Sequence, residues 1–199
     1  VTMAKTVEMA LDKGVKIGVH PGLPDLEGFG RRVMKISNEE ARSYMIYQIG
    51  ALNGFVKVLG GKLNHVKPHG ALYNMAAKDY NLAKVLAEAV YDVDPELIFV
   101  GLSNSLMIKA AQDTGLTVLN EVFADRAYNN DGTLVSRSKE GAVLHDIDLC
   151  VDRIIKMIEE NKVISIDGTE INIKADTICL HGDNEEALQL AKSIYARCF

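Results

Sequence analysis

The sequence predicts an α/β protein built on a parallel sheet. Five short apolar segments alternate with amphipathic helical patterns, the order that is typical of βαβ units. Hydrophobic residues make up 48% of the 199 residues and charged residues 25%, as in ordinary globular domains. No linker, internal repeat or low-complexity stretch divides the chain, so we expect a single domain over residues 1–199.

Composition disfavours several classes of partner. The net charge of -5 argues against nucleic acid or an anionic membrane as the main partner. No apolar run reaches the length of a membrane-spanning helix, and no signal-peptide pattern occurs. The three cysteines, Cys150, Cys179 and Cys198, have no metal-binding spacing, which favours reduced thiols and the cytoplasm. Association of several copies of the chain is left open.

The chain opens within a helical pattern that Gly14 ends. This helix has no capping residue at Val1, so we expect an upstream part to be missing. Ser37 and Glu40 form a capping box for the next helix, and Asp79 and Asp146 are placed to cap two later ones. The five predicted strands span residues 15–20, 63–66, 97–102, 116–122 and 177–180. A hairpin is expected around Asp167-Gly168-Thr169.

Three of the five predicted strands end at a histidine followed by proline or glycine. They are His20-Pro21, Lys67-Pro68-His69-Gly70 and His181-Gly182-Asp183. Because the carboxyl ends of parallel strands meet at one edge, chemistry collects there. Glu121 lies near the end of another predicted strand, and Asp125 and Arg126 follow it, so the sequence predicts a site at this edge.

The central turn predicts a catalytic role for Lys67 and His69. A lysine and a histidine at one strand end can bind an anion, polarise a carbonyl group or move a proton. The alternative is a hydrogen-bonded turn with an exposed lysine. His20 is either a structural histidine or a member of the site. His181 and Asp183 are candidates for metal ligands or for an acid–base pair. The alternative is that Asp183 only caps the final helix.

Other polar residues are candidates for binding substrate or phosphate. The long loop from His20 to Arg32 is of a kind that is usually functional or mobile, and it carries Asp25 and Arg31. Asp125 and Arg126 either take part in the site or form an ion pair that positions the loop. Arg137 either binds an anion or is a solvated loop charge. Tyr73 and Tyr128 lie close to the predicted site. His20, His69 and His181 are candidate ligands for a divalent metal, although no HxH or HxxxH spacing supports one.

Four stretches resemble the LamB/YcsF family in collinear order. They are His20-Pro21-Gly22-Leu23-Pro24-Asp25 with Phe29-Gly30-Arg31, residues 65–74, residues 121–128 with Asp131-Gly132-Thr133-Leu134-Val135, and Cys179-Leu180-His181-Gly182-Asp183. The resemblance implies a seven-stranded (β/α) barrel of the glycoside hydrolase/deacetylase type. It implies the A subunit of the ATP-hydrolysing 5-oxoprolinase, which opens the lactam of 5-oxoproline to L-glutamate with partner subunits B and C and ATP as co-substrate.

Given that chemistry, we expect Lys67 with Arg31 or Arg126 to hold phosphate or carboxylate, and His69 or His181 with Asp183 to transfer protons. Family members begin with acidic strand motifs that are not found here, so we expect two strands to be lacking and this form to be inactive. Two alternatives remain: a non-catalytic substrate-binding subunit, and a metal-dependent deacetylase or amidohydrolase acting on a carbohydrate-like substrate.

Overall fold

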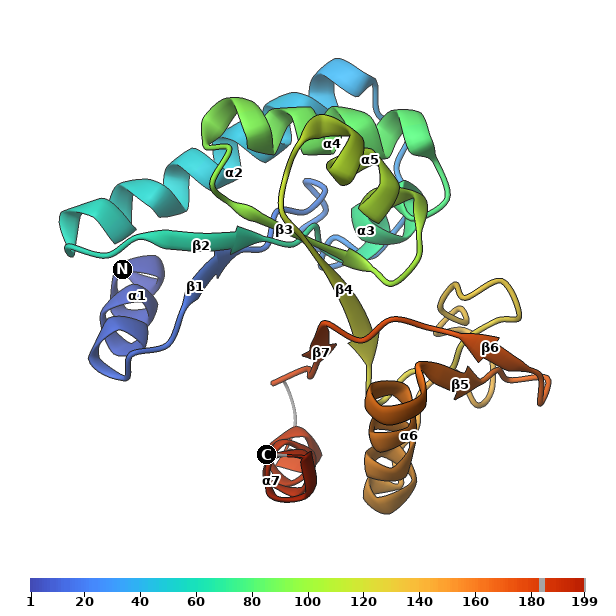
Figure 1. The fold of residues 1–199 in the computed structure, drawn as a ribbon. Coiled ribbons are helices and arrows are strands. Elements are labelled where there is room, and N and C mark those ends of the chain that lie inside the picture. Colours follow the sequence, from blue (N-terminus) through green and yellow to red (C-terminus); the bar gives the residue numbers. More distant parts are fainter. Residues whose placement is uncertain (183–184, 199) are drawn as a thin grey trace. The chain divides into compact units, whose positions relative to one another are not determined.

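A computed structural model of the chain describes residues 1–182 and 185–198 (Figure 1). The chain divides into two compact units, each with its own packed interior. The first unit contains residues 1–101 and 106–119, and the second contains residues 102–105 and 120–199.

The first unit consists of three parallel strands and their connecting helices. Its elements are α1 (Thr2–Asp12), β1 (Ile17–Val19), α2 (Asn38–Val58), β2 (Leu63–Val66), α3 (Gly70–Ala76), α4 (Tyr80–Val93), β3 (Ile98–Leu102) and α5 (Leu106–Thr114). β2 pairs with β1 on one side and with β3 on the other.

The second unit contains two parallel strands, a hairpin and two helices. Its elements are β4 (Val118–Phe123), α6 (Ile147–Glu160), β5 (Lys162–Ile164), β6 (Glu170–Asn172), β7 (Thr177–Cys179) and α7 (Glu185–Cys198). β4 pairs with β7 in parallel register, and β5 pairs with β6 in antiparallel register. The predicted hairpin is therefore confirmed, with Gly168 in its turn at φ 82°.

Strands β3 and β4 each run from the first unit into the second. Phe99 N–H donates to Thr117 O at 2.8 Å, and Ser103 N–H donates to Glu121 O at 3.0 Å. Over the described residues the strand order is β1-β2-β3-β4-β7. The predicted α/β class and its five parallel strands are confirmed, whereas closure into a seven-stranded barrel stays a prediction.

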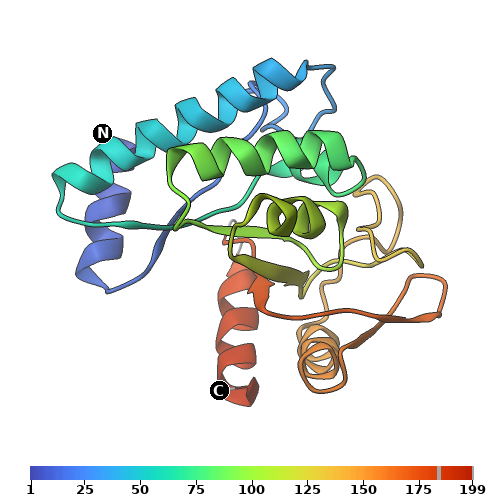
Figure 2. The same cartoon turned by 45° about the horizontal axis from the view of Figure 1, so that its top comes forward.

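The helices of the first unit follow their apolar periodicity. α2 buries Ala41, Met45, Ile49 and Val56, positions that recur at helical spacing. It packs beside α4, as both views show (Figure 1 and Figure 2). The capping box that begins α2 is present: Ser37 Oγ accepts Glu40 N–H at 3.1 Å, and Glu40 Oε2 accepts Ser37 N–H at 2.7 Å.

The second unit is organised around the apolar face of α6. Asp146 caps this helix by accepting Leu149 N–H at 3.0 Å. Val151, Ile154 and Met157 are fully buried along it, and α7 packs against it. Within the part of the chain that the structure describes, we find no helix that combines the length and apolarity needed to cross a membrane.

Candidate functional site

The ends of β1 and β2 bring two of the predicted histidines together. His20 follows β1 and His69 follows β2, and parallel pairing places the two strand ends side by side. His69 Nδ1 lies 2.9 Å from His20 Nε2. Their rings meet at 72° with centroids 4.7 Å apart. The expectation that histidines at neighbouring strand ends converge is confirmed for this pair.

Each ring of this pair also contacts a backbone carbonyl. His20 Nδ1 lies 2.7 Å from Lys67 O, and His69 Nε2 lies 2.7 Å from Phe29 O. The backbone continues the β1–β2 pairing beyond the strands, because Lys67 N–H donates to Val19 O and His69 N–H donates to Pro21 O. The turn is thus fixed by both main-chain and side-chain bonds.

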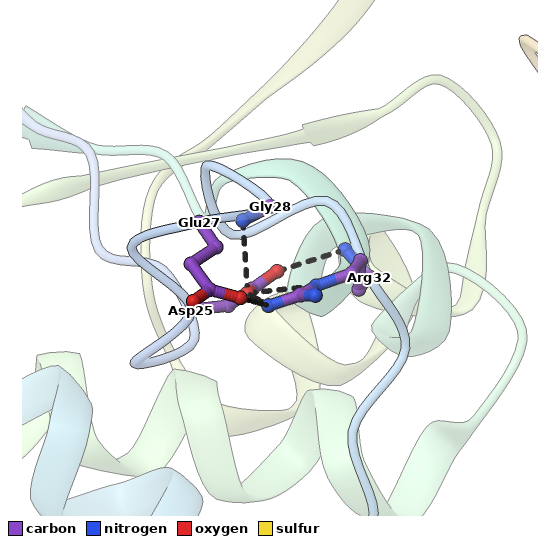
Figure 3. A network of polar contacts seen from close by, with 4 residues as sticks. All are labelled: Asp25, Glu27, Gly28 and Arg32. Atoms are coloured by element: carbon purple, nitrogen blue, oxygen red, sulfur yellow. Dashed lines mark hydrogen bonds and ion pairs between the residues drawn. The ribbon is translucent and has the colours of Figure 1, made fainter.

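The loop after β1 is organised by the carboxylate of Asp25 (Figure 3). This buried side chain accepts Gly28 N–H at 3.0 Å and Arg32 Nε–H at 2.9 Å, and it forms an ion pair with the Arg32 guanidinium. Hydrogen bonding to Arg32 and then to the Gly28 amide lowers the pKa of Asp25 to about 2. Asp25 therefore stabilises the loop from within, which differs from the predicted role in binding substrate.

Glycines allow this loop to approach the turn after β2. Gly70 has φ 56°, and a Cβ there would lie 2.5 Å from Gly30 O. Ala71 N–H donates to Gly30 O at 2.9 Å. Phe29, at φ 53°, packs edge-on against the His69 ring with centroids 5.4 Å apart. Only glycine fits at position 70, because any side chain would separate the loop from the turn.

A second cluster lies in the other unit, where β4 and β7 end. His181 Nδ1 lies 3.0 Å from Asp125 Oδ2. Burial raises the pKa of Asp125, but the hydrogen bond and charge of His181, with a contribution from Arg137, lower it below its usual value. Asp125 is therefore ionised at neutral pH. Since a carboxylate only accepts hydrogen bonds, His181 donates to Asp125 from Nδ1, which leaves Nε2 as the ring nitrogen that can take up or release a proton.

A small pocket adjoins this pair. It has a volume of about 40 Å³, which is room for a few water molecules. Its wall is mostly apolar and includes Val143, Leu144, Ile147, Leu180 and Leu190 together with Cys150, Asp125 and His181. Asp125 Oδ1 is buried and has no hydrogen-bond partner among the residues that the structure describes. The pair therefore borders a space that is large enough for water.

Two residues that the sequence predicted for ligand binding lie buried in the second unit. Tyr128 is fully buried, its hydroxyl accepts Phe123 N–H at 2.9 Å, and burial raises its pKa. Arg126 is also buried and donates to the carbonyl groups of Val135 and Ala142. Both side chains hold the segment after β4 in place, because a buried polar group must be satisfied by internal partners.

The remaining predicted residues occupy varied places. Arg31 is exposed, with its guanidinium carbon 5.4 Å from the centre of the Phe29 ring. Arg137 is exposed, Lys67 is half-buried and Tyr73 is buried on α3. Asp183 lies outside the described residues. Among the described residues, no three histidine, cysteine or carboxylate side chains are grouped closely enough to hold a metal ion.

The structure adds residues that sequence reasoning missed. Arg32 rather than Arg31 binds Asp25. Arg153 of α6 donates to Ala124 O and Arg126 O, and so fixes the backbone on both sides of Asp125. Cys150 lines the pocket. No local motif marks these residues. Arg153 contacts a segment that is distant in sequence, and which of the two adjacent arginines reaches Asp25 depends on the backbone of their shared loop.

Comparison with known proteins places the chain among close relatives. It is 58% identical over 192 residues to the protein of Alkaliphilus metalliredigens that is named as the A subunit of 5-oxoprolinase, covering 96% of this chain and 75% of that protein. It is 60% identical to the protein of the same name from Campylobacter jejuni serotype O:6, with the same coverage.

A solved structure is also similar. The crystal structure of the lactam utilization protein from Thermus thermophilus matches with a TM-score of 0.90 and 40% identity, covering 98% of this chain and 79% of that one. Residues 1–198 match the LamB/YcsF family as a whole. The chain belongs to the LamB/YcsF family.

Proposed function

We propose that the chain is the A subunit of an ATP-dependent 5-oxoprolinase, a hydrolase that opens the lactam of 5-oxo-L-proline to L-glutamate. The names of its relatives support this assignment. The observation that carries it is the 3.0 Å contact between His181 Nδ1 and Asp125 Oδ2 beside a pocket of water size. Hydrolysis of an amide requires a water molecule and a base, and this geometry supports a base beside a space of water size.

The proposed chemistry begins with a stable amide. Resonance protects the lactam carbonyl from water, so phosphorylation of its oxygen at the expense of ATP would activate it. Asp125 holds the tautomer of His181 in which Nε2 is free of a proton. Nε2 then takes a proton from the attacking water, and the carboxylate stabilises the imidazolium that forms. The C–N bond breaks as the imidazolium returns this proton to the ring nitrogen of the substrate, and a second water molecule releases phosphate from the acyl phosphate that remains.

The positive charge and solvent exposure of two further side chains support a role in binding an anion. We propose that Lys67 and Arg31 attract the substrate carboxylate or a phosphate group, since cations that solvent can reach suit such anions. The sequence has no Walker or GxGxxG loop, so we assign no residue of this chain to ATP. We propose that subunits B and C complete the complex and that it works in the cytoplasm.

The test is a reconstituted assay that follows glutamate release from 5-oxoproline with ATP and subunits B and C. Asp125→Asn should lower kcat by about 10²- to 10⁴-fold with little change in KM, because it removes the carboxylate that holds the His181 tautomer. His181→Gln should lower kcat at least as much. Divalent metal and chelator arms test the metal-dependent alternative.

The matched control is Asp152→Asn on the exposed surface of α6, where Asp152 pairs only with Arg197 among the contacts described. It makes the same chemical change in the same unit and should leave turnover unchanged. Full turnover by Asp125→Asn and His181→Gln would remove this pair from the reaction. Absence of glutamate release from the wild-type system would refute the proposed function when the A subunit has the full length of its relatives, since the 199-residue form by itself is expected to be inactive.

A further inference from the structure

Arg153 of α6 holds the two backbone carbonyl groups that flank Asp125. Its two terminal nitrogens donate to Ala124 O at 3.2 Å and to Arg126 O at 3.0 Å. The carbonyl group between them, Asp125 O, accepts Leu144 N–H at 2.8 Å. Three consecutive carbonyl groups are therefore fixed, and the planar guanidinium group spans the outer two at once.

The position of the Asp125 carboxylate depends on this backbone. Oδ2 lies 3.0 Å from His181 Nδ1, whereas Oδ1 is buried and has no hydrogen-bond partner among the described residues. Within that part of the chain, no bond to Oδ1 orients the carboxylate. Its orientation toward His181 is therefore set by where the backbone places Asp125, and in an enzyme a displacement of about 1 Å can cost about 10²-fold in rate.

The face of α6 that carries Arg153 also forms part of the pocket wall. Ile147 and Cys150 line the pocket, and Arg153 follows Cys150 at the same spacing along the helix, which places the three side chains on one face. Burial lowers the pKa of Arg153, because the folded protein removes this charge from water. The two carbonyl bonds offset that cost. α6 thus connects the pocket wall to the segment that carries Asp125.

We infer that Arg153 is a positioning residue for the reaction, because it holds residues 124–126 so that the Asp125 carboxylate stays in contact with His181 beside the pocket. This role rests on the proposed function, since it concerns the same site. The bonds of Arg153 go to the backbone of the protein. Their loss should therefore lower kcat and leave KM nearly unchanged.

The test follows glutamate release by an A subunit that has the full length of its relatives, with subunits B and C and ATP. Arg153→Ala should lower kcat by about 10- to 100-fold, with KM within about twofold of the wild-type value. Arg153→Lys keeps the charge, but its ammonium group lacks the planar fork that spans two carbonyl groups. Its kcat should lie between those of the wild type and Arg153→Ala.

A double-mutant cycle separates positioning from a general structural effect. In the Asp125→Asn background, Arg153→Ala should lower kcat no further, because Arg153 acts through the Asp125 carboxylate. A general structural role would instead give losses that multiply. Arg197→Ala is the matched control, since it removes another arginine of the same unit, one that pairs with the exposed Asp152. This control should leave kcat unchanged.

The outcomes distinguish the positioning role from the proposed function. Full turnover by Arg153→Ala, or losses that multiply in the cycle, would overturn the positioning role and leave the proposed function standing. An inactive wild-type complex would overturn the proposed function, and the role of Arg153 with it. If Arg153→Ala does not fold, Arg153→Lys decides, and a wild-type kcat for that variant would overturn the positioning role.

Discussion

Asp25 accepts hydrogen bonds from the Gly28 amide and from Arg32, and these bonds are what lower its pKa to about 2. In the unfolded chain the same carboxyl titrates near 3.8. The unfolded state therefore binds more protons between these values. The Asp25 contribution to stability is present above about pH 4 and is lost as the pH falls toward 2.

We predict that Asp25→Asn lowers the free energy of unfolding at pH 7 and weakens its decline below pH 4. Urea unfolding at several pH values measures both effects. Arg32 is 61% exposed, so added salt should reduce the difference between the variant and the wild type. An unchanged acid dependence in the variant would show that Asp25 does not carry it.

Gly70 and Gly60 form a matched pair of left-handed glycines, at φ 56° and 77°. A Cβ at Gly70 would lie 2.5 Å from Gly30 O, whereas a Cβ at Gly60 would meet nothing within 4 Å. Gly60→Ala should cost about 1 kcal/mol of stability from backbone strain alone. Gly70→Ala should cost about 2–4 kcal/mol, since overpacking adds to the strain. Equal losses in urea unfolding would contradict the role assigned to the Gly30 contact.

For single side chains, the sequence predicted their place at a strand end or in a loop better than it predicted which residues they contact. His20 and His69 were expected at strand ends because strand periodicity and the Pro or Gly that follows are local signals. The partner of Asp25 could not be read in the same way, because Arg31 and Arg32 are adjacent and the loop backbone decides which one turns inward. Burial of Tyr128 depends on the tertiary structure of the second unit.

Among the helices and strands, α2 shows how a local motif defines a helix. Its first turn is held by the reciprocal bonds of Ser37 and Glu40, and hydrogen bonding to Ser37 lowers the pKa of Glu40. Ser37→Ala should destabilise the protein by about 1 kcal/mol. Ser43→Ala, at an exposed site on the same helix, should stay within about 0.5 kcal/mol. Thermal or urea unfolding compares the two, and similar losses would discount the cap.

The order and type of the elements were predictable, and their lengths were less so. Residues 15–20 have the composition of a strand, yet β1 covers only Ile17–Val19. Strand length depends on where neighbouring strands stop pairing, which is a non-local property. Helices such as α6 were predicted more fully, because the Asp146 cap and the apolar spacing lie within the segment itself.

At the scale of the whole protein, the reactivity of the three cysteines depends on how deeply each thiol is buried. All three lie outside any disulfide bond, with Cys150 and Cys179 buried and Cys198 partly exposed. Burial raises the pKa of the Cys150 thiol, which reduces its reactive thiolate. We predict that a thiol reagent modifies Cys198 first in the native protein and all three cysteines in urea. Intact mass measured over time gives the count, and rapid native labelling of Cys150 would contradict its burial.

The family and the α/β class could be recognised from the sequence because four long motifs occur in order. The two clusters could be predicted only as lists of strand-end residues. Which histidine pairs with His69 and which with Asp125 depends on strand order, since β1 lies beside β2 whereas β7 lies beside β4. Strand order is a property of the assembled sheet, and no single segment encodes it.

The second unit is discontinuous in the chain, and this affects how the protein can be dissected. Residues 102–105 belong to it, although 14 residues of the first unit (106–119) separate them from the rest. Ser103 Oγ accepts Lys174 N–H at 2.8 Å, and Asn104 N–H donates to Asn120 Oδ1 at 3.2 Å. A gene fragment beginning at Asn120 would lose both contacts. Expressing this unit alone would require grafting the 102–105 segment onto the fragment, and cloning boundaries chosen from linear order would cut through its interior.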